Sequence, residues 1–404
     1  MTLGFIILIL LCLLATWYEK KTYKTMMAPT TIMVWPFVIV IFLALFMGPL
    51  FGFKRINENE IWIIILGIFS FFVGEILWNI VLRKKTRNFK INRVQYSDRF
   101  LRIANNYLEY VVIILALRYV IIFRSIGFST YFATDGGNEI MTKGIYIHLM
   151  LSLFPLIPVL FDKGMFDKNK KTLLFVGIFI VEVFLTYTKY HVIMLLIATM
   201  FYIITFRPKA LPFVCTALVV IPIMAFSLNY FLNFRANGNI LSSKYLAGHL
   251  MNYLIGGVSY SSVSNSWLHN LDFWNLVGSF VMPFPNLFIR MILGFSVCPP
   301  IEIPFITLSS FGERGNVVNF ITLVLGGSKI GGVIFFLILG MIASGIIGRK
   351  KENSMLKVYF LAVIFLSFFS AYLGLIVPWE VFFWCVVINF ISKHKVKFGD
   401  RIKI

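Results

Sequence analysis

The sequence predicts an all-α protein, a polytopic bundle of membrane-spanning helices. Of the 404 residues, 59% are hydrophobic and only 13% are charged, with a mean hydropathy of +0.87. A soluble domain of this size would need a far larger charged surface. The apolar runs approach the ~20 residues that a helix needs to cross a bilayer. They are continuous rather than alternating, which excludes a transmembrane β-barrel.

The apolar runs predict about 11 spans, within a range of about 10–13. Two of them share the single stretch 172–206 and therefore form a tight hairpin. The predicted spans are 3–17, 30–51, 61–82, 106–123, 146–161, two within 172–206, 211–232, 330–347, 355–376 and 378–391.

The net charge of +20 reflects basic loops on one side of the membrane. Loop 83–102 carries eight Lys and Arg against one acid, and each other predicted cytoplasmic segment is basic as well. By the positive-inside rule, the N-terminus lies outside and the C-terminus is cytoplasmic. The same rule explains the charge without nucleic acid, which is not an expected partner. The first apolar run lacks a charged n-region and a cleavage motif, so it is interpreted as a span rather than a signal peptide.

The spans divide the chain into three consecutive parts. Residues 1–232 form an N-terminal bundle of about eight spans, and 330–404 form the C-terminal spans and a basic tail. Between spans eight and nine, 233–329 is predicted to be one large outer loop region. Pro283 and Pro285 break any straight helix there, so re-entrant or broken helices are expected. Irregular backbone at membrane depth is tolerated where it lines a cavity, and the site is therefore expected here.

Several chemistries have no motif in the chain. The four Cys are scattered, with no zinc-like or redox spacing. There is also no P-loop, HExxH, GxSxG or outer DxD-like pair. ATP use, metallopeptidase chemistry, a serine lipase site and metal-bound nucleotide-sugar chemistry are therefore not expected, and neither a metal nor a cofactor is predicted.

The irregular region contains three arginines, Arg235, Arg290 and Arg314. Because basic residues are disfavoured outside the membrane, and because guanidinium groups present a fork of donors suited to phosphate, these three are candidates for an anion site. The alternative is that each reaches lipid headgroups or pairs with a nearby acid. Glu302 and Glu313 are candidate general bases, although Glu313 could simply form a surface pair with Arg314.

Five further residues are candidates for substrate binding. Arg118 lies within a span, where it either faces the bundle interior or extends to the interface. Lys189 and His191 lie at the tip of the hairpin, where an interface marker is the alternative for Lys189. His249 and Tyr260 lie in the irregular region, where a structural role is the alternative for the histidine.

Three acidic residues fall within predicted spans. Glu182 lies near the middle of its span and is predicted to be buried, either protonated or paired. Glu75 lies near the cytoplasmic end of its span and Glu380 near the outer end, so both are predicted to reach water.

Several segments resemble motifs of the bacterial oligosaccharide repeat-unit polymerases (O-antigen, Wzy-type). The tip LTYTKYHVIMLL resembles that family's Thr/Gly-Ser-Arg turn, with Lys189 where Arg is usual. NFRANGN resembles the basic stretch that opens the family's large loop, which makes Arg235 its counterpart. FVMPFPNLFIR resembles its Phe–Pro–x–Pro segment, which is followed by a basic residue, here Arg290.

The stretch 315–340 resembles the family's Asn-Val-x-Thr stretch, its Gly-rich turn and the following span. Here Asn319 stands in place of the Thr, and Gly326-Gly327-Ser328 stands in place of Asp-Phe-Gly. The resemblance covers the layout of most of the chain, including the late large loop.

The resemblance implies a metal-independent glycosyltransferase of the outer face of the bacterial cytoplasmic (inner) membrane. It would polymerise undecaprenyl-pyrophosphate-linked repeat units in O-antigen or capsule synthesis. Its partners would be the lipid-linked donor and acceptor glycans, the bilayer and a chain-length regulator in the membrane. An O-antigen ligase-like enzyme and a lipid-linked glycan flippase are the alternatives, and a flippase is expected to show two similar halves, which this chain lacks.

Overall fold

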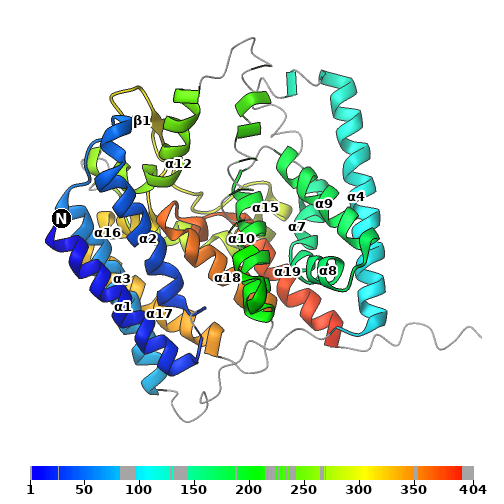
Figure 1. Cartoon of the computed structure of the whole chain (residues 1–404), viewed down its shortest axis with the longest axis horizontal. Coiled ribbons are helices and arrows are strands. Elements are labelled where there is room, and N and C mark those ends of the chain that lie inside the picture. Colours follow the sequence, from blue (N-terminus) through cyan, green and yellow to red (C-terminus); the bar gives the residue numbers. More distant parts are fainter. Residues whose placement is uncertain are drawn as a thin grey trace, which may run out of the picture. The chain divides into compact units, whose positions relative to one another are not determined.

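The computed structural model describes residues 2–25, 27–81, 96–127, 130–131, 144–186, 189–213, 243–263, 268, 270–348 and 354–393, with isolated residues between 216 and 235. The described chain is all-α apart from one two-stranded hairpin, as the composition predicted (Figure 1). The strongly basic part of loop 83–102 and the C-terminal tail beyond 393 lie outside the described residues.

Five helices of the described chain are long and apolar enough to cross a membrane, which confirms a membrane protein. A sixth candidate is a pair of helices bent by 50°. The five are α1 (Leu3–Tyr23), α2 (Pro29–Phe46), α3 (Glu58–Val81), α17 (Lys329–Gly348) and α19 (Ile376–Lys393). Most of the predicted span 211–232 lies outside the described residues.

The chain folds into two compact units that are discontinuous in sequence. Unit 1 comprises Met1–Ile91, Leu241–Glu352 and Phe360–Trp379. Unit 2 comprises Asn92–Ile240, Asn353–Tyr359 and Glu380–Ile404. Each unit therefore combines segments from both ends of the chain, whereas the partition expected from the sequence was consecutive.

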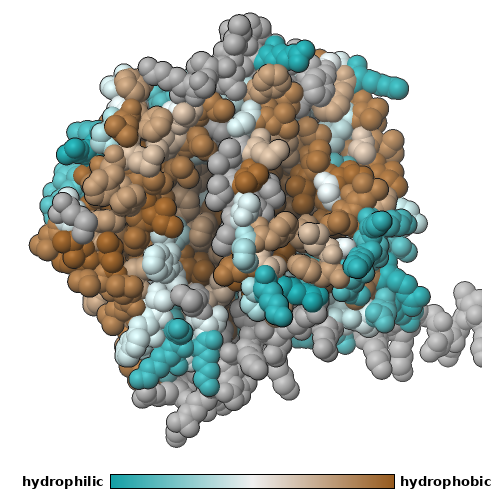
Figure 2. Space-filling view, viewed as in Figure 1, coloured by the Kyte–Doolittle hydropathy of each residue, from teal (hydrophilic) through white to brown (hydrophobic). Residues whose placement is uncertain are grey.

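The centre of unit 1 is the contact between α3 and α17, which is the most extensive helix–helix contact in the described chain. Two glycines make it close. A methyl group at Gly74 would overlap the carbonyl group of Leu337, and one at Gly340 would overlap the carbonyl oxygen of Phe71. Small residues let backbones approach in this way in membrane bundles. In Figure 2, hydrophobic side chains cover the surface of unit 1 over α1 and α2.

Polar side chains join α1, α3 and α17 within unit 1. The Tyr23 hydroxyl and the Ser344 hydroxyl are hydrogen-bonded at 2.7 Å. The amide of Asn79 donates to Tyr23 at 2.7 Å, and Ser344 donates to the Asn79 oxygen at 3.2 Å. Because buried polar groups in an apolar surrounding need partners, this triangle fixes how the three helices rotate against one another.

The region expected to be irregular is largely helical but broken. Its main elements are α12 (Ser243–Val263), α14 (Phe273–Val281), α15 (Pro283–Leu293), β1 (Ile306–Thr307), β2 (Arg314–Gly315) and α16 (Phe320–Gly327). The predicted break is confirmed, since α14 ends at Val281 and α15 begins at Pro283. Proline fits the first turn of a helix but cannot continue one. Asp272 and Asn319 cap α14 and α16 through their side chains.

The predicted span 355–376 is not one unbroken helix. Helix α18 (Ser354–Phe365) ends early and is followed by two 3-10 turns, η3 (Leu366–Phe368) and η4 (Tyr372–Gly374). The carbonyl oxygens of Phe368 and Phe369 lie against Gly257 of α12, where a methyl group would meet them at 2.8 and 2.6 Å. The indole N–H of Trp379 donates a hydrogen bond to the carbonyl of Leu373 at 2.7 Å. The broken backbone is thus covered by protein, as a membrane environment requires.

Unit 2 contains α4 (Asp98–Ile126), α7 (Ile145–Leu153), α8 (Ile157–Phe166), α9 (Lys170–Leu185), α10 (Lys189–Phe206) and the turn η2 (Pro208–Ala210). The predicted span 146–161 is the bent pair α7 and α8. Pro155 and Pro158 lack the N–H that would continue the helix there, and the Phe154 carbonyl accepts from the Tyr359 hydroxyl at 2.6 Å and from the Ile157 N–H at 3.3 Å. Helices α18 and α19 are each divided between the units.

The acidic residues within helices differ from the expectation in two of three cases. Glu182 is buried, as predicted, and neither of its carboxylate oxygens has a hydrogen-bond partner among the described residues. Glu75 was predicted to reach water but is 0% exposed. Glu380 is also buried, where it meets His148 Nδ1 at 2.8 Å within unit 2. In both corrections a neighbouring helix covers the carboxylate, which position along one helix does not reveal.

Candidate functional site

A cavity of about 720 Å³ lies in unit 1, within the range of about 300–1,000 Å³ common for small-molecule sites. Its walls come from α14, the extended segment 300–305, α16 and the break 370–375. All of these are places where the helical pattern stops or changes direction. Most of the lining comes from the region 233–329, where the sequence predicted the site, and residues 370–375 come from the predicted span 355–376.

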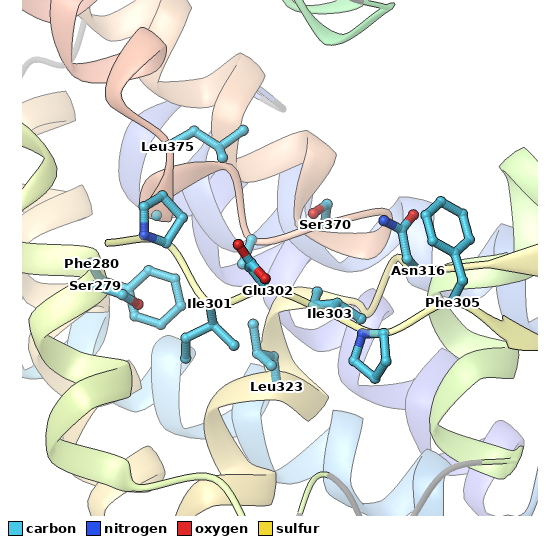
Figure 3. Close-up of a pocket in the computed structure, with 14 residues that line it drawn as sticks. Ser279, Phe280, Ile301, Glu302, Ile303, Phe305, Asn316, Leu323, Ser370 and Leu375 are labelled. Carbon is cyan, nitrogen blue, oxygen red and sulfur yellow. The ribbon is translucent and has the colours of Figure 1, made fainter. Parts of the chain in front are cut away.

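Glu302 is the one charged residue among the fourteen described residues that line this cavity. Its side chain is exposed, and Figure 3 shows its carboxylate in the middle of the cavity. The side chains of Ile301 and Leu323 lie below it in that view, and Ser370 lies on the opposite side. An accessible carboxylate among apolar walls, with few other polar groups, has the composition of a site that orients a polar ligand.

The backbone that carries Glu302 is held in place. The buried Tyr260 hydroxyl donates to the carbonyl of Pro304 at 2.8 Å. Beyond it, β1 and β2 form an antiparallel hairpin, and the Asn252 amide of α12 donates to the carbonyl of Arg314 at 2.8 Å. The hairpin also reaches the turn before α3, where Ser309 donates to the carbonyl of Phe51 at 2.7 Å. Tyr260 therefore anchors the cavity wall rather than facing the cavity.

His249 and Glu313 form a pair beside the hairpin. Glu313 is 8% exposed, and its Oε2 lies 2.8 Å from Nδ1 of His249. The histidine ring stacks on Tyr245 with 5.4 Å between ring centroids and meets the edge of Tyr253. Burial raises the pKa of the Tyr245 phenol, and the charge of Glu313 adds to the shift. Glu313 thus pairs with a histidine of α12, and no ion pair with Arg314 occurs between the described side chains.

Two of the three candidate arginines belong to unit 1. Arg314 lies on β2 with an exposed side chain, and its carbonyl is the group that Asn252 holds. Arg290 lies near the C-terminal end of α15, and its side chain is outside the described part of the chain. Arg235 belongs to unit 2, where its side chain is exposed.

The other candidates from the sequence also lie in unit 2. The half-buried Arg118 of α4 places its guanidinium 4.9 Å from the centre of the Tyr146 ring, a cation–π contact. Lys189 begins α10, and its side chain lies outside the described part. His191 is 1% exposed and packs against Tyr190, and neither of its ring nitrogens has a hydrogen-bond partner within the described part of the chain.

Sequence reasoning missed three polar residues of the cavity, Ser279, Asn316 and Ser370. Asn316 stands directly after the hairpin, within the stretch that carries the family resemblance. Ser370 was assigned to a continuous span. The signal that could have revealed it is local, because Ser367, Ser370 and Gly374 interrupt an otherwise apolar run.

No family model, no curated protein and no solved structure matches this chain. The case for a function therefore depends on the geometry and on the sequence motifs described above.

Proposed function

We propose that this chain is a membrane glycosyltransferase that joins lipid-linked oligosaccharide repeat units. The substrates would be glycans on undecaprenyl pyrophosphate, and the reaction would take place on the outer face of a bacterial cytoplasmic membrane. The observation that carries the proposal is the Glu302 carboxylate in a cavity bounded by helix breaks. The motif resemblance supplies the substrate class.

The residues of unit 1 suit the chemistry. The acceptor hydroxyl attacks the anomeric carbon of the donor sugar, and Glu302 accepts the proton that this hydroxyl loses. The bond from the anomeric carbon to the phosphate oxygen breaks, and its electron pair stays on the pyrophosphate. Arg290 and Arg314 would stabilise that growing negative charge with charge-assisted hydrogen bonds. Asn316 and Ser370 would hold sugar hydroxyls.

Reconstitution separates this function from its alternatives. Purified protein in liposomes would receive lipid-linked single repeat units extracted from host cells that lack the protein. We expect products with two or more repeats, with one undecaprenyl pyrophosphate released for each new glycosidic bond. Gel ladders and phosphate analysis measure the two quantities.

Each alternative has its own outcome in the same assay. A ligase would leave single repeats unjoined but would transfer them to an added lipid A–core acceptor. A flippase would move the substrate between leaflets without changing its length. Glycan of unchanged length under all conditions, from protein that binds the substrate, would contradict the proposal.

An outer-face reaction depends on the proposed topology, which has about 11 spans, the N-terminus outside and the C-terminus in the cytoplasm. It can be tested in intact cells with single cysteines in a background without the native ones. Asn59→Cys, at the exposed start of α3 on the outer side, should react with an impermeant thiol reagent. Lys21→Cys, exposed near the C-terminal end of α1 on the cytoplasmic side, should not react. The reverse pattern would turn the cavity toward the cytoplasm and rule out an outer-face reaction.

A further inference from the structure

Two carboxyl groups of unit 1 lie next to each other in the interior, far along the chain from Glu302. Glu19 of α1 and Glu75 of α3 are both 0% exposed. Both bond to Thr30, which places the two carboxyl groups beside each other. Two ionised carboxylates at that separation would repel each other strongly where water is excluded.

The surrounding hydrogen-bond donors satisfy only some of the oxygens of this carboxyl pair. Both oxygens of Glu19 accept backbone N–H groups at the start of α2, from Thr30 at 2.8 Å and from Thr31 at 2.7 Å. These bonds satisfy helix donors that would otherwise have no partner, and they stabilise one negative charge. The Thr30 hydroxyl donates to Oε2 of Glu75 at 2.5 Å.

Among the described residues, two buried oxygens near this pair have no hydrogen-bond partner, Oε1 of Glu75 and Oγ1 of Thr31. Both residues are more than nine-tenths buried. Buried polar atoms in proteins almost always have partners, so an unpartnered oxygen on a carboxylate that lies beside a second carboxyl group indicates a missing ligand. What two acceptors require between them is a cation.

The other charged and titratable groups nearby do not supply it. Tyr23 interacts with Glu75, and its hydroxyl is already bonded to Ser344 and Asn79. The Cys12 thiol lies further back on α1, and α2 presents only Thr30 and Thr31. Within the described chain, no Lys or Arg forms an ion pair with either carboxylate, and the lysines that end α1 are exposed.

We propose that Glu19 and Glu75 form a binding site for one monovalent cation, a proton or a sodium ion, which bridges their carboxyl groups at the N-terminus of α2. The bound cation leaves one net negative charge, which matches the positive end of the α2 dipole. The site ties α1, α2 and α3 together, and it is independent of the glycosyl-transfer reaction proposed above.

The test compares the thermal unfolding of the full-length protein in detergent over a range of pH, with sodium chloride or choline chloride. In choline, the Tm of the wild type should fall as pH rises, because losing the proton leaves two adjacent anions in a dry interior. A bound cation stabilises by mass action, so we expect about 1–2 °C per tenfold change in its concentration once the site is unsaturated. If sodium restores the Tm at alkaline pH, the bound cation is sodium. If the dependence of Tm on pH is the same in both salts, the bound cation is a proton.

Glu75→Gln provides the matched variant. Its amide donates a hydrogen bond to Glu19 at every pH, so its Tm should lose both the pH and the sodium dependence. Glu109→Gln, which changes a carboxylate of α4 paired with Lys171, should keep the wild-type profile. A wild-type profile identical to that of Glu75→Gln in both salts overturns the proposal.

Chemical labelling of the wild type keeps the test valid if the variant does not fold. Dicyclohexylcarbodiimide reacts with protonated carboxyl groups in apolar surroundings. Peptide mass spectrometry should find the label on Glu19 or Glu75 at neutral pH and not on Glu109. Suppression by sodium, but not by choline, again identifies sodium, and absence of label from both residues contradicts a shared cation.

Discussion

Replacing Glu302 by Gln should slow the extension of glycan chains by roughly 100-fold or more, which is the range that removal of a general base produces. Gln has nearly the same volume and still fits the cavity, but its amide cannot accept a proton. Because the Glu302 side chain is exposed to the cavity, the fold should not depend on its charge. The ratio of polymer to single repeats, at matched amounts of membrane protein, measures the effect.

Two further variants make this result specific. Glu302→Asp keeps the carboxylate but withdraws it by one methylene group, so partial activity is expected. Glu58→Gln changes a carboxylate elsewhere in unit 1 and keeps the oxygen that accepts from Gly4, so chain extension should be normal. If Glu302→Gln made full-length glycan, the base would have to be another residue.

Gly340→Val should destabilise the protein by about 3 kcal/mol or more, at the upper end of the range for overpacked interiors. A side chain at this position meets the backbone of Phe71 and Glu75, and neither can move aside without separating α3 from α17. Gly74→Val should have a similar effect through Leu337. Thermal unfolding in detergent measures both, and a drop in the amount of protein in the membrane should accompany it.

Gly177 of α9 is the matched control. A methyl group there meets nothing within 4 Å, so Gly177→Ala should be neutral or should stabilise by about 0.5–1 kcal/mol through helix propensity. If all three glycine variants had equal stability, close backbone contact between α3 and α17 would be excluded.

Local signals in the sequence predicted the all-α membrane class and the break at Pro283. Both depend on properties of the residues themselves, namely apolar run length and a missing backbone N–H. The break after Phe365 was missed because a run that is apolar on average hides Ser367 and Ser370. In that segment the decisive partner is Gly257 on a distant helix.

In the candidate site too, contacts between distant segments could not be predicted from the sequence. Glu302 and Glu313 could be selected as acids in the irregular region, but their partners could not be. Glu313 meets His249 across two elements, and the wall opposite Glu302 includes Ser370 from a later segment. Likewise, a sequence gives the depth of Glu75 within its span but not the rotation of the helix, and that rotation turns the carboxylate toward Glu19.

The contact between α3 and α17 can form only late in synthesis, because the two helices are far apart in the chain. Helix α3 ends at Val81 and α17 at Gly348, so about 270 residues must be made between them. At roughly 5–20 residues per second, the ribosome needs on the order of 15–50 s for this stretch. During that interval α1 and α2 can already pack on α3, but Gly74 has no partner. A nascent chain stalled before α17 would therefore expose a bare backbone groove to lipid, chaperones and proteases.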